Sequence, residues 1–378
     1  MSLYLDYNSS APILPEVLDT MIETYQNTIG NADSRTHIYG TNAQKAVQSC
    51  RTRMAAILGV NPDEIIFTSG STESNDTVLL GIEDYARSTG KTHIISTAIE
   101  HKAVLEPLKV LERKGFQVDF VVPDSSGRID AQTLCGLVRP ETCLVSVMYV
   151  NSETGIIQPV EEIGRFLRER DVYFHVDATQ ALGKLNPHIR ELSYDMMSIS
   201  GHKIGGPQGV GALLLRRDTR YKRPPITPLM YGGSQERGFR PGTTPVALVS
   251  GFSKAVEICE RDLEKNMSNC RRIKQSLLSA ISSLPYTFNG DQAYCLPSTA
   301  NISIDGLDAE TAFLCLGEDY SFSNGSACNS SSHSLSYVLG AMGLEEKRIS
   351  EAIRLSWDGS VDVDFSSFVS VISSIIQS

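Results

Sequence analysis

Short apolar runs and longer amphipathic stretches alternate through the first 250 residues of the chain. The apolar runs predict strands at 65–68, 92–95, 118–122, 144–150 and 172–176. The amphipathic stretches predict helices from about Leu14, over 41–58, from Thr72, and over 102–114, 130–138 and 160–170. This alternation predicts an α/β fold with a mostly parallel sheet, helices on both faces, and active groups at the carboxyl ends of the strands.

The pattern changes after about residue 255. One long helix with charge on one face is predicted from Lys254 to about Ile281, followed by a strand near 299–304 and a final helix. We therefore predict a large domain over residues 15–255, and a smaller α+β domain formed by residues 1–14 together with 256–378.

Composition narrows the classes of protein to consider. The net charge is 34 − 44 = −10, and no long Lys/Arg run is present, so we expect no direct contact with nucleic acid. No signal peptide follows Met1 and no apolar run is long enough to cross a membrane, so we expect a cytoplasmic protein. The eight cysteines lack paired CxxC spacings, which argues against a disulfide framework and against a metal site.

A lysine and an aspartate lie at the ends of two neighbouring predicted strands. Lys203 follows an apolar strand in Ser200-Gly201-His202-Lys203, and Asp177 ends the preceding strand 26 residues earlier (203 − 177). Pyridoxal phosphate needs such a pair, a lysine for its aldehyde and an anion for its pyridinium nitrogen. Alone, the lysine motif would suggest a surface turn; with Asp177 it favours the cofactor.

Three further polar stretches end predicted strands at the same edge. Ser71 and Thr72 begin a helix, which suits a phosphate, and an ordinary helix cap is the alternative role. His101 could stack on a pyridine ring and relay protons. Asn151 could bind a substrate carboxylate or the cofactor's phenolic oxygen, and Gln180 the latter, but both amides could equally be ordinary turn residues.

Three stretches in the second half of the chain carry further candidates. Thr243 lies in a Gly/Arg-rich loop, which is either a flexible surface loop or a subunit boundary that reaches a neighbour's phosphate. Eleven of the fourteen residues 321–334 are small or Asn, which predicts a mobile loop that carries Cys328 as an exposed thiol. Arg354, on an apolar strand, needs either a structural ion pair or a substrate carboxylate.

Together these stretches resemble the pyridoxal-phosphate-dependent cysteine desulfurases with a long cysteine loop (NifS/IscS-like), over essentially the whole chain. The resemblance implies the aminotransferase-like fold type I of pyridoxal-phosphate-dependent transferases and a homodimer. It is carried by Tyr4-Leu5-Asp6, Thr68-Ser69-Gly70-Ser71-Thr72-Glu73, Glu100-His101-Lys102, His175-Val176-Asp177-Ala178-Thr179-Gln180, Ser200-Gly201-His202-Lys203 and Ser323-Asn324-Gly325-Ser326-Ala327-Cys328.

The resemblance also implies a role for each candidate residue. Lys203 would hold the cofactor and remove the α-proton of L-cysteine, and Cys328 would attack the substrate sulfur, leaving a persulfide and releasing alanine. Asp177 would pair with the pyridinium nitrogen, while His101 would stack on the ring. The phenolic oxygen would bind Gln180, the phosphate would bind Thr72, Ser200, His202 and the neighbour's Thr243, and the substrate carboxylate would bind Asn151 and Arg354.

The chain departs from the common pattern of these enzymes at several positions. Tyr7 to Ala11 replace the usual Asn-Asn-Ala-Thr-Thr run, Leu335 stands where a proline usually follows the loop, and the Leu-Gly-Arg continuation of housekeeping members is missing near the C-terminus. The Arg354-Leu355-Ser356-Trp357 ending and the Gly30–His37 stretch are most similar to the desulfurases of DNA phosphorothioation (Dnd or Ssp type). That likeness implies a sulfur acceptor in a DNA-modification system.

Three alternatives stay open at this point. The first is a housekeeping desulfurase for iron–sulfur clusters or tRNA thiolation. The second is another enzyme that uses pyridoxal phosphate, such as an aminotransferase or a selenocysteine lyase, in which Cys328 would be dispensable. The third is a non-catalytic docking or sulfur-carrier subunit, which the intact Lys203 and Asp177 disfavour.

Overall fold

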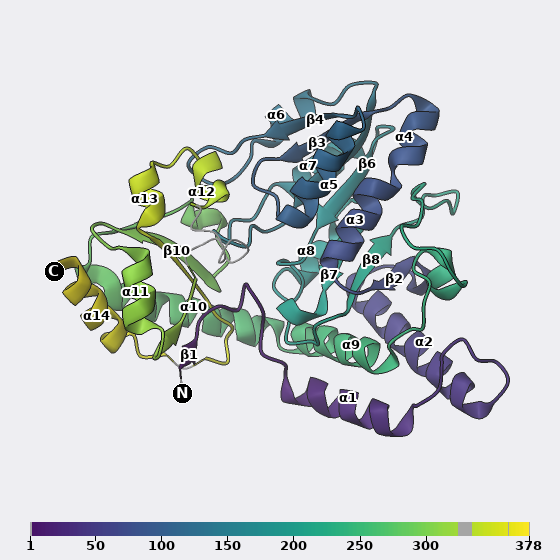
Figure 1. Ribbon diagram of the computed structural model, residues 1–378, viewed down its shortest axis with the longest axis horizontal. Helices are drawn as coiled ribbons and strands as arrows, with labels where there is room; N and C mark the ends of the chain where they lie inside the picture. The colour runs from purple at the N-terminus through teal and green to yellow at the C-terminus, as the bar shows by residue number, and fades with distance from the viewer. Residues whose placement is uncertain (1, 324–334, 362, 378) are drawn as a thin grey trace.

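A computed structural model describes residues 2–323, 335–361 and 363–377 of the chain (Figure 1). Its largest element is a seven-stranded sheet with the strand order β2-β8-β7-β6-β5-β3-β4. Neighbouring strands from β7 to β4 are parallel, and β8 runs antiparallel to both β2 and β7. In sheet order the strands are Ile65–Thr68, Gly211–Leu215, Met196–Ser200, Tyr173–Asp177, Thr142–Met148, His93–Thr97 and Gln117–Val121. The predicted mostly parallel sheet is therefore confirmed.

Successive side chains of each strand point to opposite faces of this sheet, and both faces are buried. Ile66, Ile94 and Leu144 enter one core, whereas their neighbours Ile65 and Ile95 enter another. The first core is covered by α3 (Ser71–Gly81), α4 (Glu83–Thr89) and α5 (Lys102–Arg113). The second is covered by α1 (Pro15–Asn27), α2 (Ile38–Leu58), α6 (Ala131–Gly136), α7 (Val160–Leu167), α8 (Asn186–Glu191) and α9 (Val246–Arg261).

A second group of elements lies to the left of the large sheet in Figure 1 and has its own apolar core. It holds a three-stranded antiparallel sheet in the order β12-β10-β9, formed by Ala352–Ser356, Thr299–Ile304 and Tyr286–Phe288. Its helices are α10 (Leu263–Ala280), α11 (Ala309–Leu316), α12 (Tyr337–Ala341), α13 (Glu346–Ser350) and α14 (Ser366–Gln377).

The N-terminal segment connects the two groups. Strand β1 (Leu3–Tyr4) pairs in parallel with β11 (Tyr320–Ser321), and Asp6 forms a bridge to Ser356. The chain then crosses to the large sheet, where α1 packs against α9. The first residues of the chain are thereby held beside strand β12, about 350 residues later in the sequence.

The single long helix predicted from Lys254 to Ile281 is wrong. The chain forms α9 and α10 instead, separated at Asp262, whose backbone leaves helical geometry at φ −104° and ψ 6°. Each helix packs on a different core, so a continuous rod would leave one apolar face uncovered. The predicted boundary after residue 255 falls inside α9, and the division into two domains stays a prediction.

Other predicted elements begin or end within a few residues of the observed ones, as α2 and α5 show. Helices α4 and α8 were not predicted, because both are too short to show a clear amphipathic period. Within the ranges that the structure describes, no helix combines the length and the apolar character needed to cross a lipid bilayer.

Candidate active site

A cavity of about 570 Å³ opens at the carboxyl edge of the large sheet. The N-terminal residues Asn8 to Ser10 close one side of it, and Tyr337 and Arg354 from the second group of elements close another. Nine of the twelve candidate residues line this cavity, namely Ser71, Thr72, His101, Asp177, Gln180, Ser200, His202, Lys203 and Arg354.

Asp177 ends strand β6 and is 6 % exposed. Its Oδ2 accepts a hydrogen bond of 2.8 Å from Asn75 Nδ2, and its Oδ1 accepts one of 3.0 Å from the Thr179 backbone N–H. Asn75 lies on the buried side of α3, and its own Oδ1 has no hydrogen-bond partner. These contacts hold a buried carboxylate in one orientation at the base of the cavity.

Lys203 follows strand β7 in a single 3₁₀ turn, Gly201–Lys203. Its Nζ donates to the backbone carbonyls of Asn8 and Ser9, at 2.7 and 2.6 Å. Gly205 lets the chain turn away behind the lysine: it has φ +73°, and a Cβ there would lie 2.5 Å from Leu14 Cγ. The amine is thus anchored between the sheet edge and the N-terminal segment.

Small hydroxyl residues and a histidine form a second group in the cavity. Ser71 and Thr72 occupy the first turn of the eleven-residue helix α3, where backbone N–H groups lack helical partners and favour an anion. Ser200 and His202 face them from the end of β7. Burial and the nearby Lys203 lower the pKa of His202 to about 4, so its ring is neutral at pH 7.

His101 caps the start of α5, where its Nδ1 accepts a hydrogen bond of 3.1 Å from the Ala103 N–H. In the neutral ring the proton is therefore on Nε2. Its neighbour Glu100 is fully buried, and burial raises the pKa of that carboxyl to about 8. The carboxyl next to His101 in the chain is therefore mostly protonated at neutral pH.

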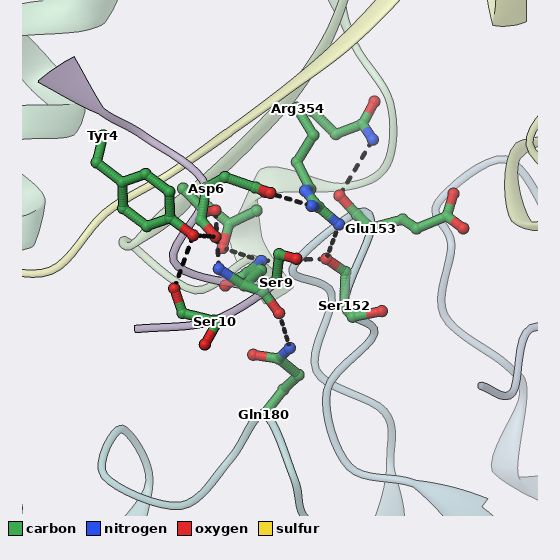
Figure 2. Close-up of polar contacts among 12 residues, drawn as sticks. Tyr4, Asp6, Ser9, Ser10, Ser152, Glu153, Gln180 and Arg354 are labelled. Atoms are coloured by element: carbon green, nitrogen blue, oxygen red, sulfur yellow. Dashed lines mark hydrogen bonds and ion pairs between the residues drawn. The ribbon is translucent and has the colours of Figure 1, made fainter. Parts of the chain in front are cut away.

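Arg354 lies on β12 and is 2 % exposed (Figure 2). Its guanidinium donates to Asp6 Oδ1 at 2.5 Å and to the Ser152 carbonyl at 3.1 Å. The Glu153 carboxylate also lines the cavity and accepts a hydrogen bond from the Ser336 hydroxyl. Arg354 therefore has a structural ion pair and also lines the cavity, while its binding of a substrate carboxylate stays a prediction.

Two of the remaining candidates, Asn151 and Thr243, do not line the cavity. Asn151 is 1 % exposed, its Nδ2 donates to the Ile99 carbonyl, and its Oδ1 accepts from the Glu153 and Thr154 N–H groups. The turn role therefore describes Asn151 in this structure better than substrate binding does. Thr243 is exposed and does not line the cavity of its own chain, and Cys328 lies outside the described residues.

Sequence reasoning missed four residues that shape the site: Asp6, Asn75, Glu100 and Glu153. Asn75 follows Ser71 by one helical turn, so the helical period could have placed it on the same face. Asp6 belongs to the Tyr4-Leu5-Asp6 motif, but no local pattern links it to its partner Arg354, 348 residues away.

The residues present fit pyridoxal phosphate. Asp177 supplies a buried anion for a pyridinium nitrogen, Lys203 an amine for an aldehyde, and the α3 N-terminus with its hydroxyls a phosphate seat. The unpartnered Asn75 Oδ1 lies beside Asp177 in a cavity that has room for the ring. Across the described ranges, no cluster of three or more His, Cys, Asp or Glu side chains could hold a metal ion.

A family model described as "Aminotransferase class-V" matches residues 3–356. Among curated proteins, the chain is 42 % identical to the cysteine desulfurase of Homo sapiens, over 93 % of this chain and 76 % of that protein. It is 40 % identical to the cysteine desulfurase IscS of Salmonella arizonae, over 94 % of this chain and 88 % of that protein.

Solved structures of related proteins are also similar to this chain over most of its length. A NifS-like protein superposes with a TM-score of 0.90 at 34 % identity, covering 100 % of this chain and 99 % of its own. DndA from Streptomyces lividans gives 0.81 at 43 % identity, with coverage of 91 % and 96 %. SspA in complex with cysteine gives 0.83 at 34 % identity, with coverage of 94 % and 98 %.

Proposed function

Since the chain belongs to the class-V aminotransferase family and is a pyridoxal-phosphate-dependent cysteine desulfurase, we propose that it supplies sulfur for phosphorothioate linkages in DNA. The observation that carries this proposal is the 43 % identity to DndA over 91 % of the chain. The likeness to SspA and the Arg354–Trp357 ending support the same assignment. The acceptor would be a protein of a DNA-modification system, since the chain has a net charge of −10 and no long Lys/Arg run to favour direct contact with DNA.

The cofactor-binding roles of the site residues are part of this proposal. Pyridoxal phosphate, when bound, supplies an electron-accepting ring that weakens bonds at the carbons next to the substrate's amino group. Asp177 would keep a proton on the ring nitrogen, and His101 would cover the ring. Gln180 would bind the phenolic oxygen. Phosphate binding would fall to Ser71, Thr72, Ser200, His202 and Thr243 of a second subunit.

The substrate would be held and cleaved by three side chains. Arg354 would bind the α-carboxylate of L-cysteine, and Lys203 would remove the proton at the α-carbon. The Cys328 thiolate would then form a bond to the substrate sulfur while the Cβ–S bond breaks. The carbon fragment keeps the bonding electrons, takes up one proton at the β-carbon, regains the proton at the α-carbon from Lys203, and leaves as alanine.

Contacts on both sides of the Cys328 stretch support its role in this reaction. Ser323, five residues before Cys328, exchanges two backbone hydrogen bonds with Arg354, at 2.6 and 3.1 Å. Ser336, eight residues after it, bonds to Glu153 at the cavity wall. The chain therefore enters and leaves this stretch at residues that are fastened to the substrate-binding side of the cavity.

We also propose that the enzyme acts as a homodimer. Thr243 is exposed, which suits a residue that completes a neighbour's phosphate site. Tyr221 and Tyr231, on the connection before Thr243, are 79 % and 84 % exposed, and burying such rings would favour association. Light scattering at micromolar concentration tests this. A mass near 83 kDa, twice 41.3 kDa, supports the dimer. A monomer that still binds the phosphate group of pyridoxal phosphate contradicts it.

A housekeeping desulfurase is the second candidate, because the human and Salmonella relatives are 42 % and 40 % identical over most of the chain. It would pass the same persulfide sulfur to an iron–sulfur or tRNA-thiolation acceptor. Only the acceptor separates the two candidates.

The first experiment establishes sulfur transfer. Mass spectrometry after addition of L-cysteine should find one added sulfur on Cys328, alanine should be released, and both should be absent in Cys328→Ser. The second isolates partners of the tagged chain from its native host and measures phosphorothioate dinucleotides after deletion of its gene. Loss of the dinucleotides that the wild-type gene restores supports the proposal; unchanged dinucleotides with only a cluster scaffold as partner would overturn it.

A further inference from the structure

Gln180 connects two lysines through its amide. Its Oε1 accepts a hydrogen bond of 3.0 Å from Lys184 Nζ, and its Nε2 donates one of 2.8 Å to the Asn8 carbonyl. That carbonyl also accepts a hydrogen bond of 2.7 Å from Lys203 Nζ. Figure 2 shows the Gln180 nitrogen directed at this N-terminal segment. Three hydrogen bonds, through the Gln180 amide and the Asn8 carbonyl oxygen, therefore connect Lys184 to Lys203.

The two bonds of the amide fix its orientation. A lysine ammonium carries three donors and no acceptor, so only the oxygen of the amide can face Lys184. The amide nitrogen is then forced to the opposite side, towards the Asn8 carbonyl, to which Lys203 Nζ also donates. If the amide were flipped, its NH₂ group would face the ammonium and its oxygen would face the Asn8 carbonyl, and both contacts would be repulsive.

The surroundings of Lys184 are unfavourable for a charged ammonium group unless a partner compensates the charge. Lys184 lines a second cavity of about 310 Å³ together with Cys259, Cys270 and Trp357, and Lys203 lines both this cavity and the first. Burial lowers the pKa of its ammonium to about 8. Within the part of the chain that is described, Gln180 Oε1 is the acceptor that its Nζ bonds. A charge in such a place requires a compensating partner.

We propose that Lys184 is a positioning residue of the active site, which holds the Gln180 amide so that its N–H side faces Lys203 and the atoms bound there. The proposal rests on the roles proposed above for Gln180 and Lys203. It assigns no contact between Lys184 and the substrate. It gives the second cavity a function in the reaction, because a side chain from that cavity sets the polarity of one wall of the first.

The test is a pH titration of the absorbance of the enzyme loaded with pyridoxal phosphate. A hydrogen-bond donor such as the Gln180 amide, facing the phenolic oxygen of the bound cofactor, favours loss of the proton from the adjacent Lys203 nitrogen. Lys184→Met should therefore raise the pH midpoint of the absorbance change by about one unit, a tenfold change in proton affinity. Lys184→Arg, which keeps the donors, should restore most of the wild-type midpoint. Cofactor affinity, measured by equilibrium dialysis, should weaken in Lys184→Met as well.

Three controls make the result specific. Lys265→Met removes a lysine from the same cavity and should not move the midpoint. In a Gln180→Met background, Lys184→Met should add no further shift, because the amide through which it acts is gone. Gln180→Glu keeps a partner for Lys184 but loses the N–H donor, so it should shift the midpoint in the same direction. It replaces Lys184→Met as the test if Lys184→Met does not fold.

Unchanged midpoints in both Lys184→Met and Gln180→Glu would overturn the proposal, as would an equal shift in Lys265→Met or an undiminished shift in the Gln180→Met background. Lys203→Ala separates failure of the site assignment itself, because it should abolish the titrating absorbance altogether. If the proposed role in DNA phosphorothioation is wrong, the outcome of this titration does not change, because no sulfur acceptor is present in it.

Discussion

Arg354 and Asp6 form an ion pair at 2.5 Å that joins the first residues of the chain to strand β12, 348 positions later. The arginine side chain is 2 % exposed and the aspartate side chain 18 % exposed. The pair fixes one fork of the guanidinium, and the Ser152 carbonyl binds another N–H group. The planar group is thereby aimed along the cavity wall before any substrate arrives.

Arg354→Lys should raise KM for L-cysteine by about tenfold to a hundredfold, with a smaller effect on kcat. Lysine keeps the charge but cannot bind Asp6, Ser152 and a carboxylate in one plane, and a charged hydrogen bond contributes about 1.5–3 kcal/mol. Steady-state alanine release measures both constants. Arg348→Lys is the matched control, since Arg348 bonds Asn289 and Phe288 away from the cavity. A KM that changes equally in both variants would contradict the role of Arg354.

Asp177→Asn should lower alanine release about 100-fold while the protein still binds pyridoxal phosphate through Lys203. The amide oxygen can still accept from the Thr179 N–H, and its NH₂ group can donate to the unpartnered Asn75 Oδ1 once the Asn75 amide turns over. The amide carries no negative charge for the ring nitrogen. Absorbance and product release, measured on the same sample, separate binding from reaction. Asp195→Asn, a carboxylate of the same sheet that accepts the Phe174 N–H, should release alanine at nearly the wild-type rate. Equal losses in the two variants would mean a general packing defect.

The buried carboxyl of Glu100 should make the folded protein less stable at alkaline pH. One of its oxygens accepts hydrogen bonds from Thr97 and the Met148 N–H, and the other has no partner. Burial raises the pKa of the folded carboxyl from 4.5 to about 8. Between these two values the unfolded chain binds fewer protons than the folded one, so the free energy of unfolding falls as the pH rises, and the loss is complete above pH 8.

Glu100→Gln removes this titration, so its stability relative to the wild type should grow from pH 5 to pH 9. The difference is at most about 4 kcal/mol, from about 1.4 kcal/mol for each pKa unit. Urea midpoints of the cofactor-free protein at both pH values measure it. Glu112→Gln, at an exposed position of α5, should show no such trend. A constant difference between Glu100→Gln and the wild type would mean that Glu100 is ionised throughout.

The sequence predicted the sheet edge well because that edge is built from local patterns. Apolar runs ending in Asp177 and before Lys203 mark where parallel strands stop, and parallel strands stop at one edge. Asp6 and Glu153 escaped prediction for the opposite reason. Their partners Arg354 and Ser336 are 348 and 183 residues away, and periodicity reports only on neighbours along one element.

Asn151 shows a different limit. A polar residue after a buried strand can serve a ligand or its own turn, and the two roles leave the same mark in the sequence. Only the closed set of bonds from Asn151 to Ile99, Glu153 and Thr154 assigns it to the turn. The break at Asp262 is similar: the charged face continues from α9 to α10, and only the two separate cores require the chain to bend there.

Ser336 and Glu153 link the start of α12 to the cavity wall. The Ser336 hydroxyl accepts a hydrogen bond of 3.1 Å from the Leu339 N–H as the helix cap, and donates its proton to Glu153 Oε2. Burial raises the pKa of Glu153 to about 7, against the lowering effects of this hydroxyl and of the Arg354 charge. One hydroxyl therefore satisfies a helix terminus and a buried carboxylate together.

Ser336→Ala should lower the free energy of unfolding by about 1 kcal/mol at pH 5, where the cap is lost but Glu153 is protonated and no buried charge loses a donor. At pH 9 the loss should be about 1–2 kcal/mol larger, because the Glu153 carboxylate must then ionise in a buried site with one donor fewer. In terms of linkage, the substitution raises the folded pKa of Glu153 further, so the additional loss develops only as the pH rises past about 7. Ser336→Thr, which keeps the hydroxyl, should recover both parts, and Ser350→Ala, which removes an exposed hydroxyl from α13, should show neither. Urea midpoints at the two pH values decide the matter: a loss of the same size at pH 5 and pH 9 would mean that the hydroxyl serves as a cap alone and that Glu153 ionises without it.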